Sequence, residues 1–402
     1  MNKLDLDYQN LLKDILENGT KKQTRNGEVI SVFGRQIRHK MSDGFPLLTT
    51  KKLHWNSIVT ELLWFLNGRT DLRWLLERGN TIWVGDAYKQ YSTYVTEEWN
   101  MGGINELFED GLLIEVEESF DYECESRQIN YRKLTKEEFI DKIKTDDEFA
   151  EKYGELGPIY GKQWRSWEQN SVAPWGGLAI NYIDQIANLI NNLKTNPDDR
   201  GMIVSAWNVG ELDQMVLRPC HNFFQVYTRE LTARERIALK SNGSTRLYDS
   251  IKEENYLTIN ADDEIHKVCD EYNIPTRAIS LMWNQRSVDT PLGLPFNIAS
   301  YGLLLEIIAK IVNMVPDELI GNLGDTHIYV NQIDGVREQL TRESYPLPTL
   351  RINTEFWPTQ TQECGVGEFT NNIDFLIKEM RIEDFQIENY QSHPAIKIPL
   401  SN

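Results

Sequence analysis

The most informative segment reads Leu217-Arg218-Pro219-Cys220-His221-Asn222-Phe223-Phe224-Gln225-Val226-Tyr227. Because proline has no N–H to donate to a sheet, we expect an ordered strand to begin after Pro219, near Phe223. Cys220 and His221 would then lie at the strand entrance, where side chains can meet a ligand. Arg218 and a neighbouring imidazole are groups of the kind that lower a cysteine pKa and so favour a nucleophilic thiolate. The alternative is that Cys220 is a small buried hydrophobic residue, a common state of free cysteine.

The composition of the whole chain limits the class of protein. With 402 residues, of which 40% are hydrophobic, the chain can form a sizeable core in one large domain or in several. The formal net charge of −19 lacks the basic footprint of nucleic-acid-binding proteins and argues against adhesion to anionic membranes. No apolar run reaches the about eighteen residues of a membrane helix, and the amino-terminal segment has no apolar signal core. We therefore expect a soluble cytoplasmic protein that binds neither DNA nor membrane.

The cysteines also indicate the compartment. The 4 cysteines, Cys124, Cys220, Cys269 and Cys364, are far apart and show no metal-ligand pairing such as Cys-x-x-Cys. This pattern is typical of a reduced, cytoplasmic protein and not of a disulfide scaffold. We expect no metal.

A predicted helix from about Asn56 to Leu66 carries a carboxylate on its apolar face. Ile58 lies three residues before Glu61 and Phe65 four residues after it, so both are its neighbours on the helix surface. A carboxylate among apolar groups is costly unless it is paired or its pKa is raised. Glu61 is therefore a candidate acid/base residue, and the alternative is a carboxylate that satisfies a buried partner.

Hydrophobic periodicity predicts further elements of a mixed α/β fold. Helices are expected over about 7–18, 183–193 and 298–311, and strands over about 29–33, 202–208 and 279–287. Two polar stretches, at about 91–151 and 228–278, are interpreted as surface insertions into a single domain spanning 1–402. The first should contain short helices, and the second interrupts what would otherwise be a short hairpin.

Two loop residues have both a functional and a simple structural interpretation. Arg25 lies in a basic turn, where a guanidinium is either solvated or suited to bidentate capture of a phosphate. Asn297 ends the turn Leu292-Gly293-Leu294-Pro295-Phe296-Asn297 and could be a helix N-cap.

Several motifs then occur in a characteristic order. They are the segment around Cys220, Gln285-Arg286-Ser287, the stretch from Leu292 to Ser300, and the stretch from Gly324 to Tyr329. Taken together they resemble the thymidylate synthase family, which includes sister pyrimidine hydroxymethylases. The match covers most of the chain outside the two insertions, and several motifs in order are far more specific than any one of them.

The resemblance implies a fold, a substrate and a reaction. The fold would be a single α/β domain whose large mixed, twisted sheet forms a homodimer face, with helices on the other face and two active sites completed across the interface. The substrate would be dUMP and the one-carbon donor 5,10-methylenetetrahydrofolate. Addition of a thiolate to carbon 6 of uracil makes carbon 5 enolate-like, and this covalent step divides a difficult substitution into easier ones.

The resemblance also implies a role for each matching residue. The catalytic set would be Cys220, Glu61, Tyr160, His221, Arg286, Asp289 and Asn297, with Glu61 as a proton-relay carboxylate and Arg286 lowering the cysteine pKa. The nucleotide phosphate would bind Arg25, Arg286, Ser287 and Arg200 of the partner subunit. The sugar would contact His327 and Tyr329, and the pocket would be ordered by Gln225 and Asp289. The folate site would comprise Lys51 at the glutamate tail and Ile82, Trp83, Asp289, Gly293 and Phe296.

The identity of one side chain favours uracil over cytosine. Asn297 offers one acceptor and two donors through its amide. Uracil presents a carbonyl and an N–H on the matching edge, whereas cytosine presents an amine and an unprotonated nitrogen. Cytosine-handling relatives carry Asp at this position.

Four departures from the family pattern concern the last step of the reaction. Gly201 stands where a second arginine is usual, Val84-Gly85-Asp86-Ala87-Tyr88 replaces an acidic and aromatic run, and Thr290-Pro291 replaces a bulkier apolar residue. The sequence ends Leu400-Ser401-Asn402 instead of in a small apolar residue. Because site closure excludes water, looser closure would favour hydration over hydride transfer. A deoxyuridylate hydroxymethylase therefore remains an alternative to a thymidylate synthase, and a catalytically inactive nucleotide- or RNA-binding relative is a third possibility.

Overall fold

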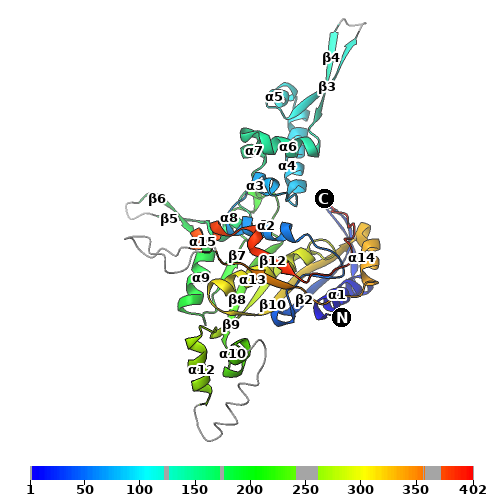
Figure 1. Ribbon diagram of the computed structural model, residues 1–402. Helices are drawn as coiled ribbons and strands as arrows, with labels where there is room; N and C mark the ends of the chain where they lie inside the picture. The colour runs from blue at the N-terminus through cyan, green and yellow to red at the C-terminus, as the bar shows by residue number, and fades with distance from the viewer. Residues whose placement is uncertain are drawn as a thin grey trace.

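A mixed sheet in the order β1-β2-β10-β9-β8-β7 forms the centre of the fold (Figure 1). A computed structural model describes residues 2–121, 126–172, 176–240, 261–355, 357 and 373–401. Within this sheet β9 and β10 run parallel and the other neighbouring strands are antiparallel. Its strands are β1 (Thr20–Thr24), β2 (Gly27–Lys40), β7 (Ile203–Ser205), β8 (His221–Glu230), β9 (Arg277–Asp289) and β10 (Val315–Tyr329). The predicted mixed α/β fold is confirmed.

Helices cover one face of the sheet. α13 (Leu294–Ile311) packs against β9 and β10, α2 (Trp55–Leu66) packs on α13, and α1 (Lys3–Asn18) packs on β2 and β10. α13 is long and apolar enough to cross a membrane, but 67% of it is buried inside the protein, which makes it a core helix. The tryptophan of β9, Trp283, stacks on Tyr301 of α13 at 5.2 Å between ring centroids and is fully buried.

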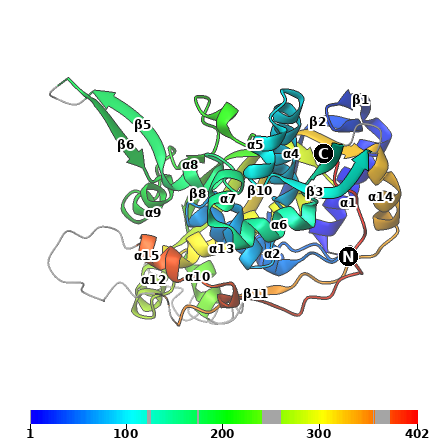
Figure 2. The same ribbon diagram turned by 90° about the horizontal axis from the view of Figure 1, so that it is seen from above.

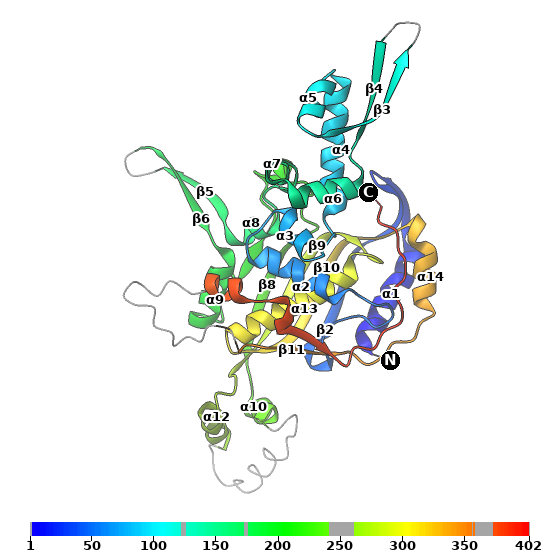
Figure 3. The same ribbon diagram turned by 45° about the horizontal axis from the view of Figure 1, so that its top comes forward.

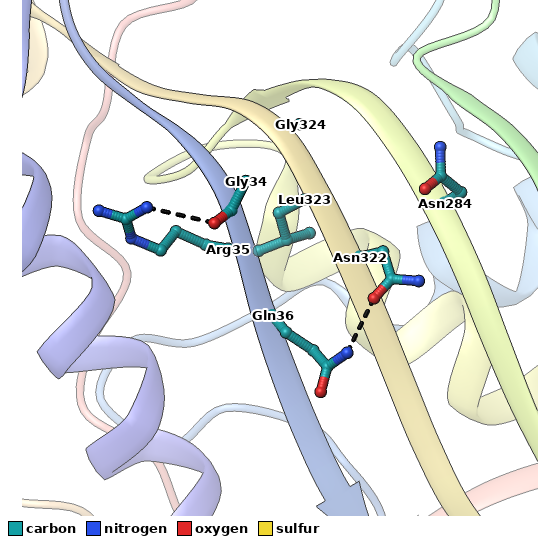
Figure 4. A pocket seen from close by; sticks show the side chains of 7 residues that line it. All are labelled: Gly34, Arg35, Gln36, Asn284, Asn322, Leu323 and Gly324. Carbon is teal, nitrogen blue, oxygen red and sulfur yellow. Dashed lines mark hydrogen bonds between the residues drawn. The ribbon is translucent and has the colours of Figure 1, made fainter.

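Among the described residues, several large apolar side chains on the opposite face of the sheet are exposed. Phe33 is 80% exposed, Tyr227 66% and Ile203 48%. A shallow cavity of about 370 Å³ opens on this side over β2, β10 and β9, where the Gln36 amide donates to Asn322 at 2.9 Å (Figure 4). Burying such aromatic groups would be favourable, so this face is suited to a partner.

The first insertion contains more structure than the predicted short helices. The predicted segment of about 91–151 includes most of α4 (Val84–Asn100) and a hairpin of β3 (Leu113–Asp121) and β4 (Ser126–Lys133). Tyr91, Phe139 and Phe149 form an aromatic cluster with ring centroids 5.2 and 5.7 Å apart. The remaining helices are α5 (Ile104–Glu109), α6 (Lys136–Thr145) and α7 (Asp147–Tyr153).

The second insertion connects the antiparallel neighbours β8 and β9 at the opposite end of the molecule (Figure 1, Figure 3). Its described part contains α10 (Ala233–Lys240) and α12 (Ala261–Glu271), which pack on each other around Ile237, Ile265 and Cys269. This small cluster is separate from the main core. Cys124, Cys364 and Asn402 lie outside the described residues.

The remaining elements surround the sheet. The hairpin of β5 (Trp167–Val172) and β6 (Leu178–Ile183) projects away from the body (Figure 2). The others are α3 (Leu72–Glu77), α8 (Tyr160–Arg165), α9 (Gln185–Thr195), α14 (Ile333–Leu340), α15 (Ile373–Glu379), β11 (Thr349–Ile352), β12 (Phe385–Glu388) and the 3-10 turns η1 (Met41–Asp43), η2 (Leu212–Gln214), η3 (Val330–Gln332) and η4 (Ile382–Asp384).

Candidate active site

Cys220 lies at the entrance of β8, which begins at His221 and not near Phe223 as predicted. Its thiol is free and half-buried, so Cys220 is not simply a buried core residue. The backbone N–H of Cys220 donates to the Tyr160 hydroxyl at 2.8 Å, and its carbonyl accepts the backbone N–H of Arg286 at 2.8 Å. The cysteine is therefore held by a neighbouring strand and by a buried tyrosine.

The side chain of Arg286 wraps the loop that carries the cysteine. Its Nε donates to the Pro219 carbonyl at 2.9 Å, and its Nη2 donates to the Arg218 carbonyl at 2.8 Å. The guanidinium lies 5.4 Å from the centre of the Trp207 ring, and the residue as a whole is exposed. Arg286 thus presents a positive charge at the entrance of β8 in a fixed orientation.

The electrostatics around the thiol differ from the sequence prediction. Burial raises the pKa of the Cys220 thiol, and the charge of Arg286 offsets this only in part. Arg218 instead pairs with Asp213 at 2.5 Å. Burial lowers the pKa of His221 to about 3, so its imidazole is neutral. The prediction that Arg218 and an imidazole lower the cysteine pKa is therefore wrong. The charge of Arg286 does lower the pKa of Cys220, as predicted, although burial outweighs it in the free protein.

His221 belongs to a buried aromatic cluster. Its Nδ1 lies 2.8 Å from the Tyr301 hydroxyl, and its ring stacks on Tyr160 at 4.3 Å between centroids. Tyr301 was not predicted, because a tyrosine within an apolar helix gives no signal of this contact. The cluster positions the Tyr160 hydroxyl toward Cys220.

Glu61 lies on α2 beside the same cluster. Its Oε1 accepts the indole N–H of Trp83 at 2.8 Å, and burial raises the pKa of Glu61 to about 7 even though this hydrogen bond lowers it. Glu61 therefore has both a buried partner and the raised pKa of an acid/base residue. α8 can approach α2 because Gly161 has no side chain: a Cβ there would lie 2.9 Å from the Phe65 carbonyl oxygen.

Asn297 lies within the first turn of α13. The helix N-cap is Gly293, without a side-chain cap, so the interpretation of Asn297 as an N-cap is wrong. Its Oδ1 accepts the Gln285 amide at 3.2 Å, and Gln285 in turn accepts the Trp283 indole N–H at 3.2 Å. This chain of bonds fixes the orientation of the Asn297 amide.

Asp289 ends β9 and makes two hydrogen bonds. Its Oδ1 accepts the Leu292 backbone N–H at 3.2 Å, and its Oδ2 accepts the Gln332 amide at 3.1 Å. Burial raises the pKa of Asp289, while these bonds and the charges of His327 and Lys51 lower it. A buried carboxylate with free lone pairs can accept N–H groups from a ligand.

Lys51 is not placed as predicted. Its side chain is only 4% exposed, and its amine donates to the Pro291 carbonyl, with a pKa lowered by burial to about 8. A contact with a folate glutamate tail requires a solvent-facing amine. Lys51 instead supports the loop beside Asp289.

The other predicted residues lie around this centre. His327 pairs with Asp289 in the β9–β10 register, and its ring meets that of Tyr329 at 5.2 Å. Arg25 is exposed, and its turn lies against Tyr329, whose ring would be 4.0 Å from a Cβ at Gly27. Ile82 is 42% exposed, and Ser287 and Phe296 are half-buried.

Gln225 and Arg200 lie on the far side of the sheet from this centre. Gln225 pairs with Ile203 of β7, and its amide donates to the Arg200 carbonyl at 3.0 Å. Gln225 therefore holds the loop of Arg200. The sequence predicted instead that Gln225 helps to order the pocket of its own subunit. The Arg200 side chain is exposed.

Asp86 is a further acidic side chain near the centre. It lies in the first turn of α4, and its charge contributes to the raised pKa of Cys220. Burial raises the pKa of Asp86 itself, and Lys89, Arg25 and Lys136 lower it in part. Its position within a departure from the family pattern was the only signal for it in the sequence.

Comparison with known proteins identifies the family. The model of the family described as thymidylate synthase matches residues 6–249 and 258–402. The chain is similar to the thymidylate synthase of Mycoplasma mobile, with 36% identity over 391 residues that cover 97% of each chain. Both matches extend across the motifs that converge on Cys220, and the chain therefore belongs to the thymidylate synthase family of methyltransferases.

Proposed function

We propose that the protein is a thymidylate synthase that converts dUMP to dTMP. The observation that supports this most directly is the free, half-buried thiol of Cys220 on a loop whose backbone is held by both the Arg286 guanidinium and the Tyr160 hydroxyl. 5,10-Methylenetetrahydrofolate, when bound, supplies the one-carbon group and the hydride. The chain's own residues bind dUMP, activate its carbon 5 and exclude water.

The first chemical step is attack of Cys220 on carbon 6 of uracil. The sulfur–carbon bond forms as the electron pair of the 5,6 double bond moves toward the carbonyl oxygen at position 4, which makes carbon 5 nucleophilic. After the one-carbon group has bonded to carbon 5, loss of the proton from carbon 5 would leave an exocyclic methylene on the nucleotide, with Cys220 still bonded to carbon 6. Addition of a hydride to this methylene would form the methyl group, restore the 5,6 double bond and release the thiolate. Because burial raises the thiol pKa in the free protein, the positive charge of Arg286 is needed to favour the thiolate.

The base is selected by Asn297. With the amide oriented by Gln285, its N–H group can donate to the uracil carbonyl while Oδ1 accepts the ring N–H. Cytosine offers the reverse pattern and leaves buried polar groups unpaired. This arrangement supports dUMP over dCMP.

Glu61 is proposed to transfer protons during the reaction. A pKa of about 7 allows both protonation states near neutral pH, as a group that acts in turn as acid and base requires. Tyr160 and His221 would complete the network through bound water. The neutral His221 can donate or accept a hydrogen bond there.

We propose that the remaining predicted residues form the nucleotide and folate sites. Phosphate would bind Arg25, Arg286, Ser287 and Arg200 of the partner subunit, and the sugar would contact His327 and Tyr329. Folate has a flat ring with N–H donors, and the site fits it: Asp289 supplies an acceptor, and Trp83, exposed Ile82, Phe296 and the side-chain-free Gly293 supply apolar surface.

We propose a homodimer formed through the sheet face opposite the helices. The exposed Phe33, Tyr227 and Ile203 support it, because a second copy would remove them from water. Gln225 holds the Arg200 loop on this same side, which suits donation of Arg200 to the partner's site. We also propose a cytoplasmic location without DNA, membrane or metal.

A deoxyuridylate hydroxymethylase remains a second candidate because of Asp86. Asp86 has no hydrogen-bond or ion-pair partner within the described part of the chain, and its charge acts on Cys220. A carboxylate there can order water, and water would convert the exocyclic methylene at carbon 5 to 5-hydroxymethyl-dUMP.

One assay separates these functions. The protein is incubated with dUMP and methylenetetrahydrofolate, and the absorbance of dihydrofolate is followed together with the nucleotide product. Dihydrofolate appearing with dTMP is the result expected, since only hydride transfer oxidises the folate. Turnover without dihydrofolate would establish hydroxymethylation. If the protein does not capture 5-fluoro-dUMP covalently, the remaining candidate is a catalytically inactive relative that only binds nucleotide or RNA.

A further inference from the structure

Gln332, at the end of η3, is completely buried and connects three segments of chain. Its Nε2 donates to Oδ2 of Asp289 at 3.1 Å and to the Pro399 carbonyl at 3.0 Å. Its Oε1 accepts the backbone N–H of Tyr329 at 3.1 Å. Both N–H donors of the amide are therefore used, and the side chain has little freedom to turn without losing a buried bond.

The three partners belong to three parts of the proposed site. Tyr329 would contact the nucleotide sugar, Asp289 would accept N–H groups of the folate, and Pro399 belongs to the carboxy-terminal segment. A single buried amide thus joins both ligand sites to the end of the chain. No motif in the sequence signals this connection, although Gln332 follows the motif that ends at Tyr329.

The carboxy-terminal segment is seated along η3 and α14 (Figure 3). Gly335 of α14 leaves room for it, since a Cβ there would lie 3.2 Å from Ile396 and 3.3 Å from Ile398. Beyond Pro399, the Asn331 amide donates to the Ser401 hydroxyl at 3.1 Å. Ile398 is buried, whereas Pro399 and Leu400 are exposed and Ser401 is half-buried, so the part of the segment beyond Ile398 can leave its seat without disrupting the core.

Departure of the segment would change the environment of Asp289. One N–H of Gln332 would lose its carbonyl partner in a buried position, which costs free energy unless the amide turns. A turned amide no longer holds Oδ2 of Asp289. Burial raises the pKa of Asp289, and the Gln332 bond is the strongest effect that opposes this rise, so the carboxylate would also become a poorer acceptor.

We infer that Gln332 is a positioning residue that couples seating of the carboxy-terminal segment to the orientation of Asp289. The folate site is then complete only when the segment is seated. This inference rests on the proposed function, in which Asp289 binds the folate.

The test uses Gln332→Glu, which keeps the acceptor for Tyr329 and removes the two amide donors. We expect KM for methylenetetrahydrofolate to rise about ten-fold, while KM for dUMP stays within about two-fold. The matched control is Gln339→Glu. Gln339 is also completely buried, on α14, but its amide donates to the Thr50 hydroxyl and not to Asp289. Its variant should leave KM for the folate within about two-fold of wild type.

Coupling is measured with a chain truncated after Ile398, which lacks the Pro399 carbonyl. If Gln332 acts through the segment, the truncated Gln332→Glu chain has the same folate KM as the truncated chain alone. The inference would be overturned if the truncation and Gln332→Glu raised KM for the folate by factors that multiply when the two changes are combined. It would also be overturned if Gln332→Glu raised KM for dUMP as much as KM for the folate. If Gln332→Glu does not fold, Gln332→Asn replaces it, because it keeps the amide but shortens its reach. Gln332→Asn should likewise raise KM for the folate and leave KM for dUMP nearly unchanged. Wild-type protein that captures no 5-fluoro-dUMP would instead refute the proposed function.

Discussion

The nucleophile and the carboxy-terminal segment belong to the same proposed site but are supported in different ways. Cys220 is held by backbone bonds to Arg286 and Tyr160, over a fully buried sheet core that includes Trp283. Pro399 is held by one hydrogen bond from the buried Gln332 amide, and Ser401 is held by two bonds with Asn331 at the exposed edge. Central strands open only on global unfolding, whereas such edges open locally. We infer from this difference that the proposed nucleophile is preformed, whereas the carboxy-terminal segment can open reversibly.

The largest expected effect comes from removing the preformed nucleophile. Cys220→Ala should reduce turnover by about 10⁴-fold or more, because no other group can form the covalent bond to carbon 6. Binding of dUMP should remain measurable by calorimetry, since the phosphate and base contacts are intact. Cys269→Ala, in the separate core of the second insertion, is the matched control and should retain wild-type turnover. Near-wild-type turnover of Cys220→Ala would exclude the thiolate mechanism.

The next largest effect concerns the acid/base residue beside the nucleophile. Glu61→Gln keeps the acceptor for the Trp83 indole but cannot ionise, so kcat should fall by about 10²- to 10⁴-fold. The limb of the pH–rate profile near pH 7 should disappear with it. A variant that retains this limb would show that another group is responsible for it.

The same substitution should change stability in a pH-dependent way. The folded-state pKa of Glu61 is raised to about 7 from 4.5, so the folded protein binds this proton more tightly than the unfolded chain. Stability from this group is full below about pH 4.5 and is lost as pH rises to about 7, by at most roughly 3 kcal/mol. Denaturant unfolding should therefore find Glu61→Gln more stable than wild type at pH 8 but not at pH 4.5. An equal difference at both pH values would contradict the raised pKa.

A smaller, selective effect is expected at the base. Asn297→Asp replaces the amide donor with an acceptor and should reduce the ratio of kcat/KM for dUMP to that for dCMP by about 10²-fold. The bond from Gln285 can persist, because a carboxylate also accepts it. Unchanged relative kcat/KM values for the two nucleotides would refute base pairing by Asn297.

The features of the site that could be predicted from the sequence are those that depend on residues close together in the chain. The strands around Cys220 and Arg286 and the helix of Glu61 have strong hydrophobic periodicity, and their motifs occur in a recognisable order. The raised pKa of Glu61 also follows, because its helix neighbours are apolar. These features depend on residues close to one another in sequence.

What sequence could not provide depends on contacts between distant segments. The neutral state of His221 results from burial against Tyr301, and the inward-facing amine of Lys51 results from the fold around Pro291. The bridge through Gln332 joins residues that no periodicity relates. A hairpin in the first insertion was missed because acidic, polar strands do not show the alternation of a half-buried sheet.

The smallest expected effect tests the outer end of the carboxy-terminal segment. Ser401→Ala removes hydrogen bonds with Asn331 at 3.1 and 3.2 Å, which lie at the exposed edge. Exposed bonds of this kind contribute within about 0.5 kcal/mol, so KM for methylenetetrahydrofolate should change by less than about two-fold. Gln332→Glu, one step further inward, should change it about ten-fold. If Ser401→Ala raised KM for the folate as much as Gln332→Glu, seating of the segment would depend on the exposed bonds of Ser401 and not on the buried amide of Gln332. The inferred role of Gln332 in holding the segment would then be contradicted.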